Sequence, residues 1–171
     1  MSKFKVMSRK ECENYCKQAA NPTFVIISIS TQDDIPYANF QNSLALKDVL
    51  YLHFNDVEDN DLNHKHYAIT DKDAELIYNF AYYYFENKEV KDIIVHCDAG
   101  VSRSAGVAAA LMKIFEDNDW PIFDNPNYCP NMTCYRKVLE CHYPSLDKSQ
   151  KEEIDKKLNH NIEIWRDKEG I

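Results

Sequence analysis

Three short apolar runs, separated by polar segments, predict buried strands. They are TFVIISI at residues 23–29, DVLYLHF at residues 48–54 and KDIIVHC at residues 91–97. Each run is rich in β-branched or aromatic side chains, as is typical of strands inside a sheet. The polar segments TQDDIPYAN and NDVEDNDLNHKHYAI, at residues 31–39 and 55–69, show no period and predict loops.

Two capping boxes mark the starts of predicted helices. Ser8 precedes Glu11 by three residues, and Thr70 precedes Asp73 by the same spacing. A hydroxyl at the first of these positions and a carboxylate at the second satisfy backbone N–H groups that a helix start leaves unpaired. We therefore predict one helix from Ser8 to about Ala20 and a second, long helix after Thr70.

The third apolar run is followed by further helical patterns. The Ala-rich segment at residues 102–117 has an apolar face broad enough to be buried, and residues 118–131 predict a loop. Two more helices are predicted at residues 132–143 and 145–160, the last with Ile154 and Leu158 facing inward.

Strands that alternate with helices predict an α/β fold, with a central, mostly parallel sheet flanked by helices. A chain of 171 residues is long enough to bury a core, and we expect one domain over residues 1–171. With only three Gly and six Pro, the chain offers little material for long flexible linkers.

Charge narrows the expected partners. The net charge is −8 and the pI is about 5.2, which disfavours nucleic acid or an anionic membrane surface as the main partner. The first residues, MSKFKVMSRKE, lack the apolar stretch of a secretory signal, and TFVIISIS is too short to span a bilayer. We therefore expect a cytoplasmic location.

The six cysteines are expected to be free thiols, because the chain is large and shows no secretory signal. Zinc is the alternative for the group Cys129, Cys134, Cys141 and His142, whose members lie near one another in the sequence. Their spacing matches no common zinc pattern and lacks a closely spaced pair of ligands. Packing in and around a helix is the preferred interpretation, and no metal or other cofactor is expected.

The strongest chemical signal lies between the third strand and the helix that follows it. Cys97 ends the strand, and the loop Asp98 to Ser102 leads into a helix N-terminus. Unpaired N–H groups and the helix dipole favour anions there, and the same field favours Cys97 as a thiolate. Arg103 can hold two oxygens of a phosphate, and Gly100 lets the backbone approach closely. Together these groups suit nucleophilic attack on a bound phosphate ester.

The full string HCDAGVSRSAG resembles the signature of the cysteine-dependent protein tyrosine phosphatase superfamily. It is most similar to the dual-specificity branch, whose members often carry an Ala-Gly-x-Ser-Arg-Ser run. The resemblance is dense over residues 92–112, thinner over residues 24–90, and fades after about residue 115. It implies a protein tyrosine phosphatase-like fold of dual-specificity size.

The resemblance also implies a metal-independent, two-step hydrolysis. Cys97 would form a cysteinyl-phosphate, Arg103 would hold the charge that develops on phosphorus, and Ser104 would stabilise the leaving sulfur. His96 would support the cysteine loop through a hydrogen bond. The residues expected to bind phosphate are those of the loop: Asp98, Ala99, Gly100, Val101, Ser102 and Arg103.

The reaction further needs a general acid, which in the similar family is an aspartate on a loop after an earlier strand. Asp56 follows the strand at residues 48–54 directly and is the preferred candidate, with Asp59 and Asp61 as alternatives. Asp33 and Asp34, after the first predicted strand, are interpreted first as turn residues.

The variable positions of the loop after Cys97 are Asp98, Ala99, Val101 and Ser102, and none of them is basic. Relatives that act on inositol phospholipids tend to carry lysines in this loop. The expected substrate is therefore phosphotyrosine in proteins, with or without phosphoserine and phosphothreonine. A phosphorylated small molecule or carbohydrate stays open as a substrate. A binding module that reads phosphate without turnover is a further alternative, which the presence of both Cys97 and Arg103 disfavours.

Overall fold

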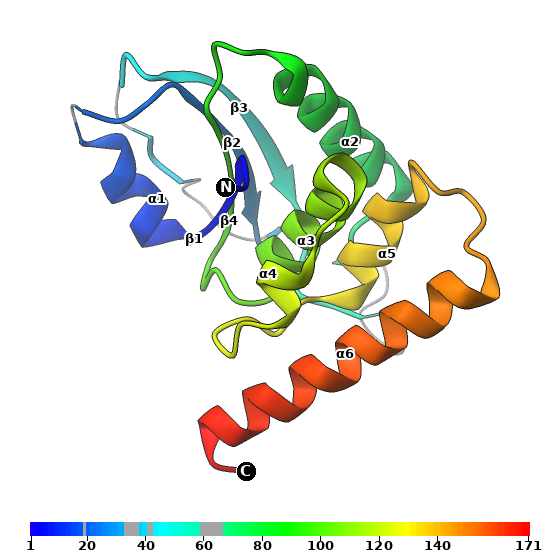
Figure 1. Ribbon diagram of the computed structural model, residues 1–171. Coiled ribbons are helices and arrows are strands. Elements are labelled where there is room, and N and C mark those ends of the chain that lie inside the picture. The colour runs from blue at the N-terminus through cyan, green and yellow to red at the C-terminus, as the bar shows by residue number, and fades with distance from the viewer. Residues whose placement is uncertain (19, 33–37, 41–42, 59–66) are drawn as a thin grey trace.

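A parallel sheet lies between two layers of helices in the computed structural model, which describes residues 1–18, 20–32, 38–40, 43–58 and 67–171 (Figure 1). Within these residues the strands are β1 (Phe4–Ser8), β2 (Phe24–Ser30), β3 (Leu46–His53) and β4 (Asp92–Cys97). They lie in the order β1-β4-β2-β3, and each neighbouring pair is parallel. The predicted α/β fold class is confirmed.

The helices are α1 (Arg9–Cys16), α2 (Asp71–Glu86), α3 (Arg103–Glu116), α4 (Trp120–Phe123), α5 (Met132–Glu140) and α6 (Lys148–Glu169). Figure 1 shows α1 on one side of the sheet and α2, α3 and α5 on the other, with α6 crossing below them. Both predicted capping boxes are formed, at Ser8 of α1 and at Thr70 of α2. No helix among the described residues has the length and apolar character needed to cross a membrane.

The first strand is an element that the sequence pattern did not predict. The residues FKVMS of β1 pair in register with β4, from Phe4 beside Ile93 to Ser8 beside Cys97. A five-residue strand at the edge of a sheet buries fewer side chains than an interior strand does. It therefore needs no long apolar run, and β1 has none that would have predicted it. Its pairing places the start of α1 beside the end of β4.

The positions of several helices also differ from the sequence prediction. Helix α1 ends at Cys16 rather than near Ala20, and α6 continues to Glu169 rather than stopping near residue 160. The short α4 lies inside the predicted loop at residues 118–131, with a proline in its first turn, where a missing N–H costs nothing. Helix ends depend on caps and tertiary contacts, which apolar periodicity does not encode.

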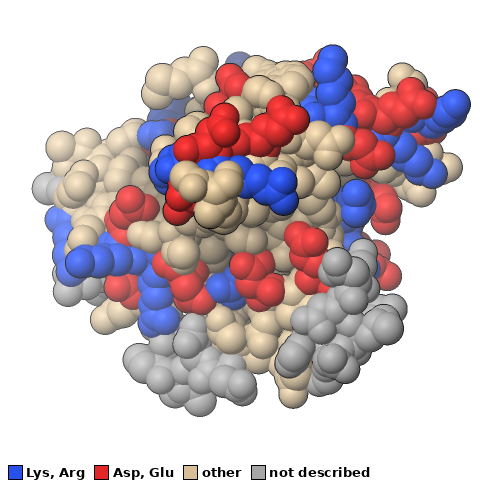
Figure 2. All heavy atoms as spheres, turned by 90° about the horizontal axis from the view of Figure 1, so that it is seen from below, with Lys and Arg blue, Asp and Glu red and all other residues tan. Residues whose placement is uncertain are grey.

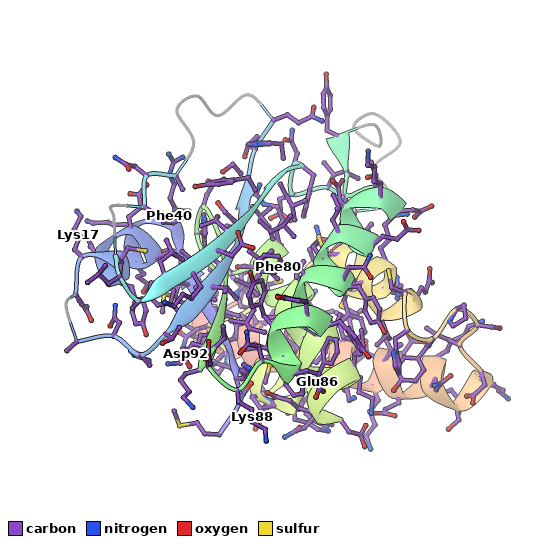
Figure 3. All side chains as sticks on the ribbon, turned by 90° about the horizontal axis from the view of Figure 1, so that it is seen from above. Lys17, Phe40, Phe80, Glu86, Lys88 and Asp92 are labelled. Atoms are coloured by element: carbon purple, nitrogen blue, oxygen red, sulfur yellow. The ribbon has the colours of Figure 1, made fainter. Side chains whose placement is uncertain are left out.

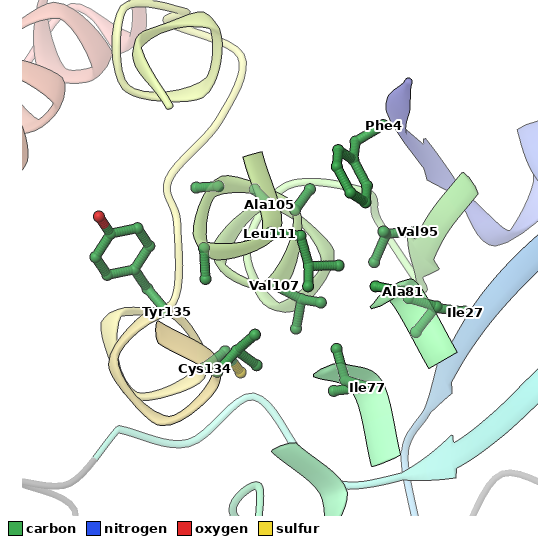
Figure 4. Packing of buried hydrophobic residues seen from close by; sticks show 14 of the residues in the cluster. Phe4, Ile27, Ile77, Ala81, Val95, Ala105, Val107, Leu111, Cys134 and Tyr135 are labelled. Atoms are coloured by element: carbon green, nitrogen blue, oxygen red, sulfur yellow. The ribbon is translucent and has the colours of Figure 1, made fainter. Parts of the chain in front are cut away.

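Strands β2 and β4 are buried on both faces, and each face supports its own core. On the α1 side, Ile26 and Ile94 pack with two cysteines of α1, and Phe40 packs against them. On the other side, Ile27 and Val95 pack against α2 and α3 (Figure 4). Figure 3 shows the same division, with Phe40 on the α1 side and Phe80 on the α2 side of the sheet. A buried central sheet of this kind fixes the ends of its strands rigidly.

Helix α3 is the centre of the larger core. Its residues from Arg103 to Met112 are all buried, because α5 and α2 pack on it from outside while the sheet lies beneath it. In Figure 4, Val107 and Leu111 of α3 lie among side chains of β2, β4, α2 and α5. Further along the chain, Ile154 of α6 is buried and Leu158 packs against the same core, as predicted. The N-terminus of α3 is therefore held in a fixed position beside the end of β4.

Candidate active site

The segment from Cys97 to Ser104 forms a tight loop at the carboxyl end of β4. Cys97 is 2% exposed, and its Sγ lies 3.1 Å from the Oγ of Ser104 in the first turn of α3. The N-cap residue Ser102 makes no side-chain capping bond to the helix. The first N–H groups of α3 are thus left without that partner, at the place where an anion would bind.

Gly100 lets this loop lie directly on the end of β1. Its φ is +70°, in the left-handed region, and a Cβ added there would lie 2.5 Å from the backbone nitrogen of Ser8. The backbone N–H of Arg9 donates to the carbonyl of Asp98 at 3.1 Å, which ties the loop to the start of α1. A side chain at position 100 would push the loop away from β1.

Arg103 is only 5% exposed, and its guanidinium is held by three groups from different loops. Its Nη1 donates to the carbonyl of Phe54 at 2.9 Å and to Oγ1 of Thr31 at 3.4 Å, and its Nη2 donates to Oδ2 of Asp98 at 2.5 Å. The Nε of Arg103 is buried and has no partner among the described residues. A buried donor without a partner is costly, so this atom is available to hydrogen-bond a bound ligand.

Asp98 is the one acidic side chain of the loop. Its carboxylate accepts from Arg103 and also from the hydroxyl of Thr31, at 3.1 Å. Burial alone would raise the pKa of Asp98, but the hydrogen bond and positive charge of Arg103 outweigh it and lower the pKa below the ordinary value. Asp98 is therefore ionised at neutral pH.

Asp56 lies at the other side of the loop, after the end of β3. Its Oδ1 accepts hydrogen bonds from Oγ of Ser102 and from Nδ2 of Asn131, both at 2.8 Å. Asn131 is the N-cap of α5 and also bonds the carbonyl of Val57, so it holds this turn of chain against the helix. Asp56 itself remains exposed to solvent.

His96 supports the loop from beneath. Its Nδ1 lies 3.2 Å from the carbonyl oxygen of Cys97, and its Nε2 lies 2.7 Å from Oγ of Ser28 in β2. Because a carbonyl can only accept, Nδ1 carries the proton and Nε2 accepts from the serine. Burial lowers the pKa of His96, so the ring is neutral at pH 7.

The structure thus brings together most of the residues selected from sequence. The acid candidate Asp56, the support His96 and the phosphate-loop residues all lie around Cys97, with Ala99 exposed and the carbonyl of Val101 accepting from the N–H of Cys129. The alternative acids Asp59 and Asp61, and the turn residues Asp33 and Asp34, lie outside the described residues.

Four contributors were not foreseen: Thr31, the carbonyl of Phe54, Asn131 and Ser28. Two of them could have been suspected, because Thr31 and Phe54 directly follow β2 and β3, and parallel strands end at one edge. Figure 2 shows the molecule from this end, where acidic and basic side chains are interspersed. No single sign of charge dominates that face.

The cysteines outside the loop do not form a metal centre in the described part of the chain. All six cysteines are free thiols, and no three His, Cys, Asp or Glu side chains cluster as metal ligands would. Cys134 is buried in α5, and burial raises its pKa well above the ordinary value, so it is protonated and packs as a small apolar group. Burial likewise raises the pKa of Cys129 and of Cys141.

The fold is shared with solved structures of phosphatases and of a phosphatase-like protein. The human tyrosine phosphatase-like serine/threonine/tyrosine-interacting protein matches with a TM-score of 0.59 at 18% identity, over 84% of this chain and 93% of that one. A mouse putative dual specificity phosphatase matches with a TM-score of 0.54 at 14% identity, over 82% of each chain. The PTP-2 phosphatase of Cydia pomonella matches with a TM-score of 0.55 at 19% identity, over 81% of this chain and 85% of that one.

No family model and no curated protein sequence matches the chain. The likeness therefore rests on structure, and it confirms the expected fold, that of small dual-specificity phosphatases.

Proposed function

We propose that this protein is a metal-independent phosphatase that hydrolyses phosphate monoesters through a cysteinyl-phosphate. The observation that carries the proposal is the buried guanidinium of Arg103, whose Nε has no partner in the part of the chain that the structure describes, in the same loop as the sulfur of Cys97. A cation buried beside a nucleophile, at an uncapped helix N-terminus, is an anion site with a reactive atom at its base.

In the first step, the sulfur of Cys97 attacks phosphorus and an S–P bond forms. The bond from phosphorus to the ester oxygen breaks, and that oxygen takes the proton of Asp56. Arg103 and the N–H groups at the start of α3 bind the phosphoryl oxygens as charge develops on them.

In the second step, Asp56, now a carboxylate, removes a proton from water, and the water oxygen attacks phosphorus. The S–P bond breaks, and the sulfur leaves with the electron pair. The hydroxyl of Ser104, 3.1 Å away, can donate to the sulfur and so stabilise it as a leaving group. Phosphate is released and Cys97 is regenerated.

Phosphotyrosine in a protein or peptide is the proposed substrate, with or without phosphoserine and phosphothreonine. Two features support this class over inositol phospholipids: the variable positions of the loop carry no lysine, and the one charged side chain among them is the acidic Asp98. An overall charge of −8 likewise supports a soluble phosphoprotein over nucleic acid or membrane, and we propose a cytoplasmic site of action.

The test is turnover of p-nitrophenyl phosphate in the presence of EDTA, with vanadate as inhibitor. We expect activity that EDTA leaves unchanged and vanadate blocks, and its complete loss in Cys97→Ser, which still binds phosphate. Full activity in Cys97→Ser would refute the mechanism. Phosphate binding by wild-type protein without turnover of any ester in a panel of phosphopeptides and phosphorylated metabolites would instead identify a binding module.

A further inference from the structure

The guanidinium of Arg103 already holds an anion that belongs to the chain. Its Nη2 bonds Oδ2 of Asp98 at 2.5 Å, while its Nε is buried and finds no partner in residues 1–18, 20–32, 38–40, 43–58 and 67–171. Nε and Nη2 form one edge of the planar guanidinium, the edge that binds an oxyanion through two parallel hydrogen bonds. One half of this edge is therefore open, and the other half is occupied by a carboxylate.

The other terminal nitrogen of the guanidinium, Nη1, is used in hydrogen bonds that hold the group in place. It bonds the carbonyl of Phe54 and the hydroxyl of Thr31, which fixes the plane of the group against the ends of β2 and β3. These neutral acceptors add no negative charge. Among the described residues, the acidic partner of Arg103 is Asp98, the residue next to Cys97.

We infer that Asp98 is a competing internal ligand of Arg103, which sets how tightly the loop binds a phosphate group. A phosphate that takes both Nε and Nη2 must displace the Asp98 carboxylate or lie against it, and two like charges at that distance repel each other. Asp98 thereby weakens the binding of every oxyanion at this site, the phosphate product included.

The surroundings of Asp98 fit this role. Its side chain is 42% exposed, so it can turn toward solvent when an oxyanion enters, and its second bond, to Thr31 at 3.1 Å, is to a neutral hydroxyl. Arg103 does not depend on Asp98 for its position, because the two Nη1 bonds and its burial hold it. Loss of the carboxylate should leave the guanidinium in place with an open edge.

The inference concerns the site of the proposed function, but its test needs no turnover. Binding of sulfate, which Cys97 cannot hydrolyse, is measured by titration calorimetry for wild type and for Asp98→Asn. We expect sulfate to bind about tenfold more tightly to Asp98→Asn, the size of effect that one removed charge produces at a partly exposed site. With p-nitrophenyl phosphate as substrate, the same variant should show a KM lower by a similar factor.

Glu13→Gln is the matched control. Glu13 lies on α1, where its carboxylate pairs with Arg9 at 3.3 Å and accepts from the backbone N–H of Asn39 at 2.9 Å. The variant therefore removes one negative charge from a residue that is not a partner of Arg103 among those described. We expect its sulfate affinity to stay within about twofold of wild type. Asp98→Ser provides a second neutral variant, should Asp98→Asn unfold in a thermal melt.

Unchanged or weaker sulfate binding in a folded neutral variant would overturn the inference, since it would show that Asp98 orients Arg103 or has no effect on the anion. The two proposals also fail separately. Tighter sulfate binding without any ester turnover would support the role of Asp98 and refute the phosphatase, whereas turnover with unchanged sulfate binding would do the reverse.

Discussion

Oδ1 of Asp56 accepts a hydrogen bond from Oγ of Ser102 at 2.8 Å, although the two residues are 46 positions apart in the sequence. One follows β3 and the other ends the loop after β4, so this bond joins the candidate acid to the candidate phosphate loop. Asn131 bonds the same oxygen and fixes the carboxylate from the side of α5. This geometry supports Asp56 as the general acid.

Asp56→Asn should lower the rate of ester hydrolysis by about a hundredfold or more, because the leaving oxygen then departs without a proton. The loss should be larger for phenyl phosphate than for p-nitrophenyl phosphate, whose leaving group needs less protonation. The basic limb of the pH–rate profile should also disappear. Steady-state kinetics over a range of pH would measure both effects.

Glu58→Gln, which neutralises an exposed carboxylate two residues further on, serves as the control and should retain the wild-type profile. If Asp59→Asn or Asp61→Asn removes the basic limb and Asp56→Asn does not, our assignment of the acid is wrong.

Ser104→Ala should slow breakdown of the cysteinyl-phosphate more than its formation, because the hydroxyl 3.1 Å from Sγ stabilises the departing sulfur. A hydrogen bond to a charged group supports a loss of about ten- to a hundredfold. Rapid-mixing experiments with p-nitrophenyl phosphate should then show a burst of nitrophenol before a slow steady state. Ser30→Ala, which removes a different buried hydroxyl, should show no such burst. Equal slowing of both steps in Ser104→Ala would argue against a role in the second step.

Gly100→Ala should destabilise the protein by about 3 kcal/mol or more, since the new Cβ would meet the backbone of β1 in addition to the strain of a positive φ. Gly170→Ala isolates the second effect, because its φ is +75° but no atom lies within 4 Å of the added Cβ. The free energy of unfolding of Gly170→Ala should fall by only about 1 kcal/mol. Urea unfolding would measure the free energy of unfolding of the two variants. Equal losses in Gly100→Ala and Gly170→Ala would mean that the backbone of β1 shifts to accommodate the added methyl group.

Buried His96 should make the protein less stable in mild acid. Its pKa is lowered by burial, so below the ordinary histidine pKa of about 6.5 the unfolded state binds a proton that the folded state does not. Stability therefore falls as the pH drops below that value, by up to about 1.4 kcal/mol per pH unit. Urea unfolding at about pH 7.5 and about pH 5.5 would measure this.

His96→Asn is expected to be less stable than wild type at neutral pH, since the hydrogen bonds to Ser28 and Cys97 are altered. Its free energy of unfolding should, however, fall less than that of wild type when the pH is lowered. His160→Asn, which removes a more exposed histidine paired with Asp124, should keep the wild-type difference between the two pH values. If His96→Asn loses as much stability as wild type between the two pH values, another group causes the loss.

Much of the fold could be predicted because its signals are local. The apolar runs of β2 and β4 and the capping boxes at Ser8 and Thr70 each lie within a few neighbouring residues, and their period or spacing suffices. The string from His96 to Ser104 is local in the same way, so the sequence by itself determined where the candidate nucleophile Cys97 and Arg103 lie and that they share one loop.

The tertiary structure decided what surrounds that loop. β1 was identified only by its pairing with β4, and the partners of Arg103 and Asp56 come from Thr31, Phe54 and Asn131, each more than 40 residues away. Such contacts depend on which loops meet at the carboxyl end of the sheet, and no residue pattern within one segment specifies that. The sequence likewise does not predict the hydrogen bond between Asp98 and Arg103. The partner of a charged side chain depends on which groups the fold brings within hydrogen-bonding distance.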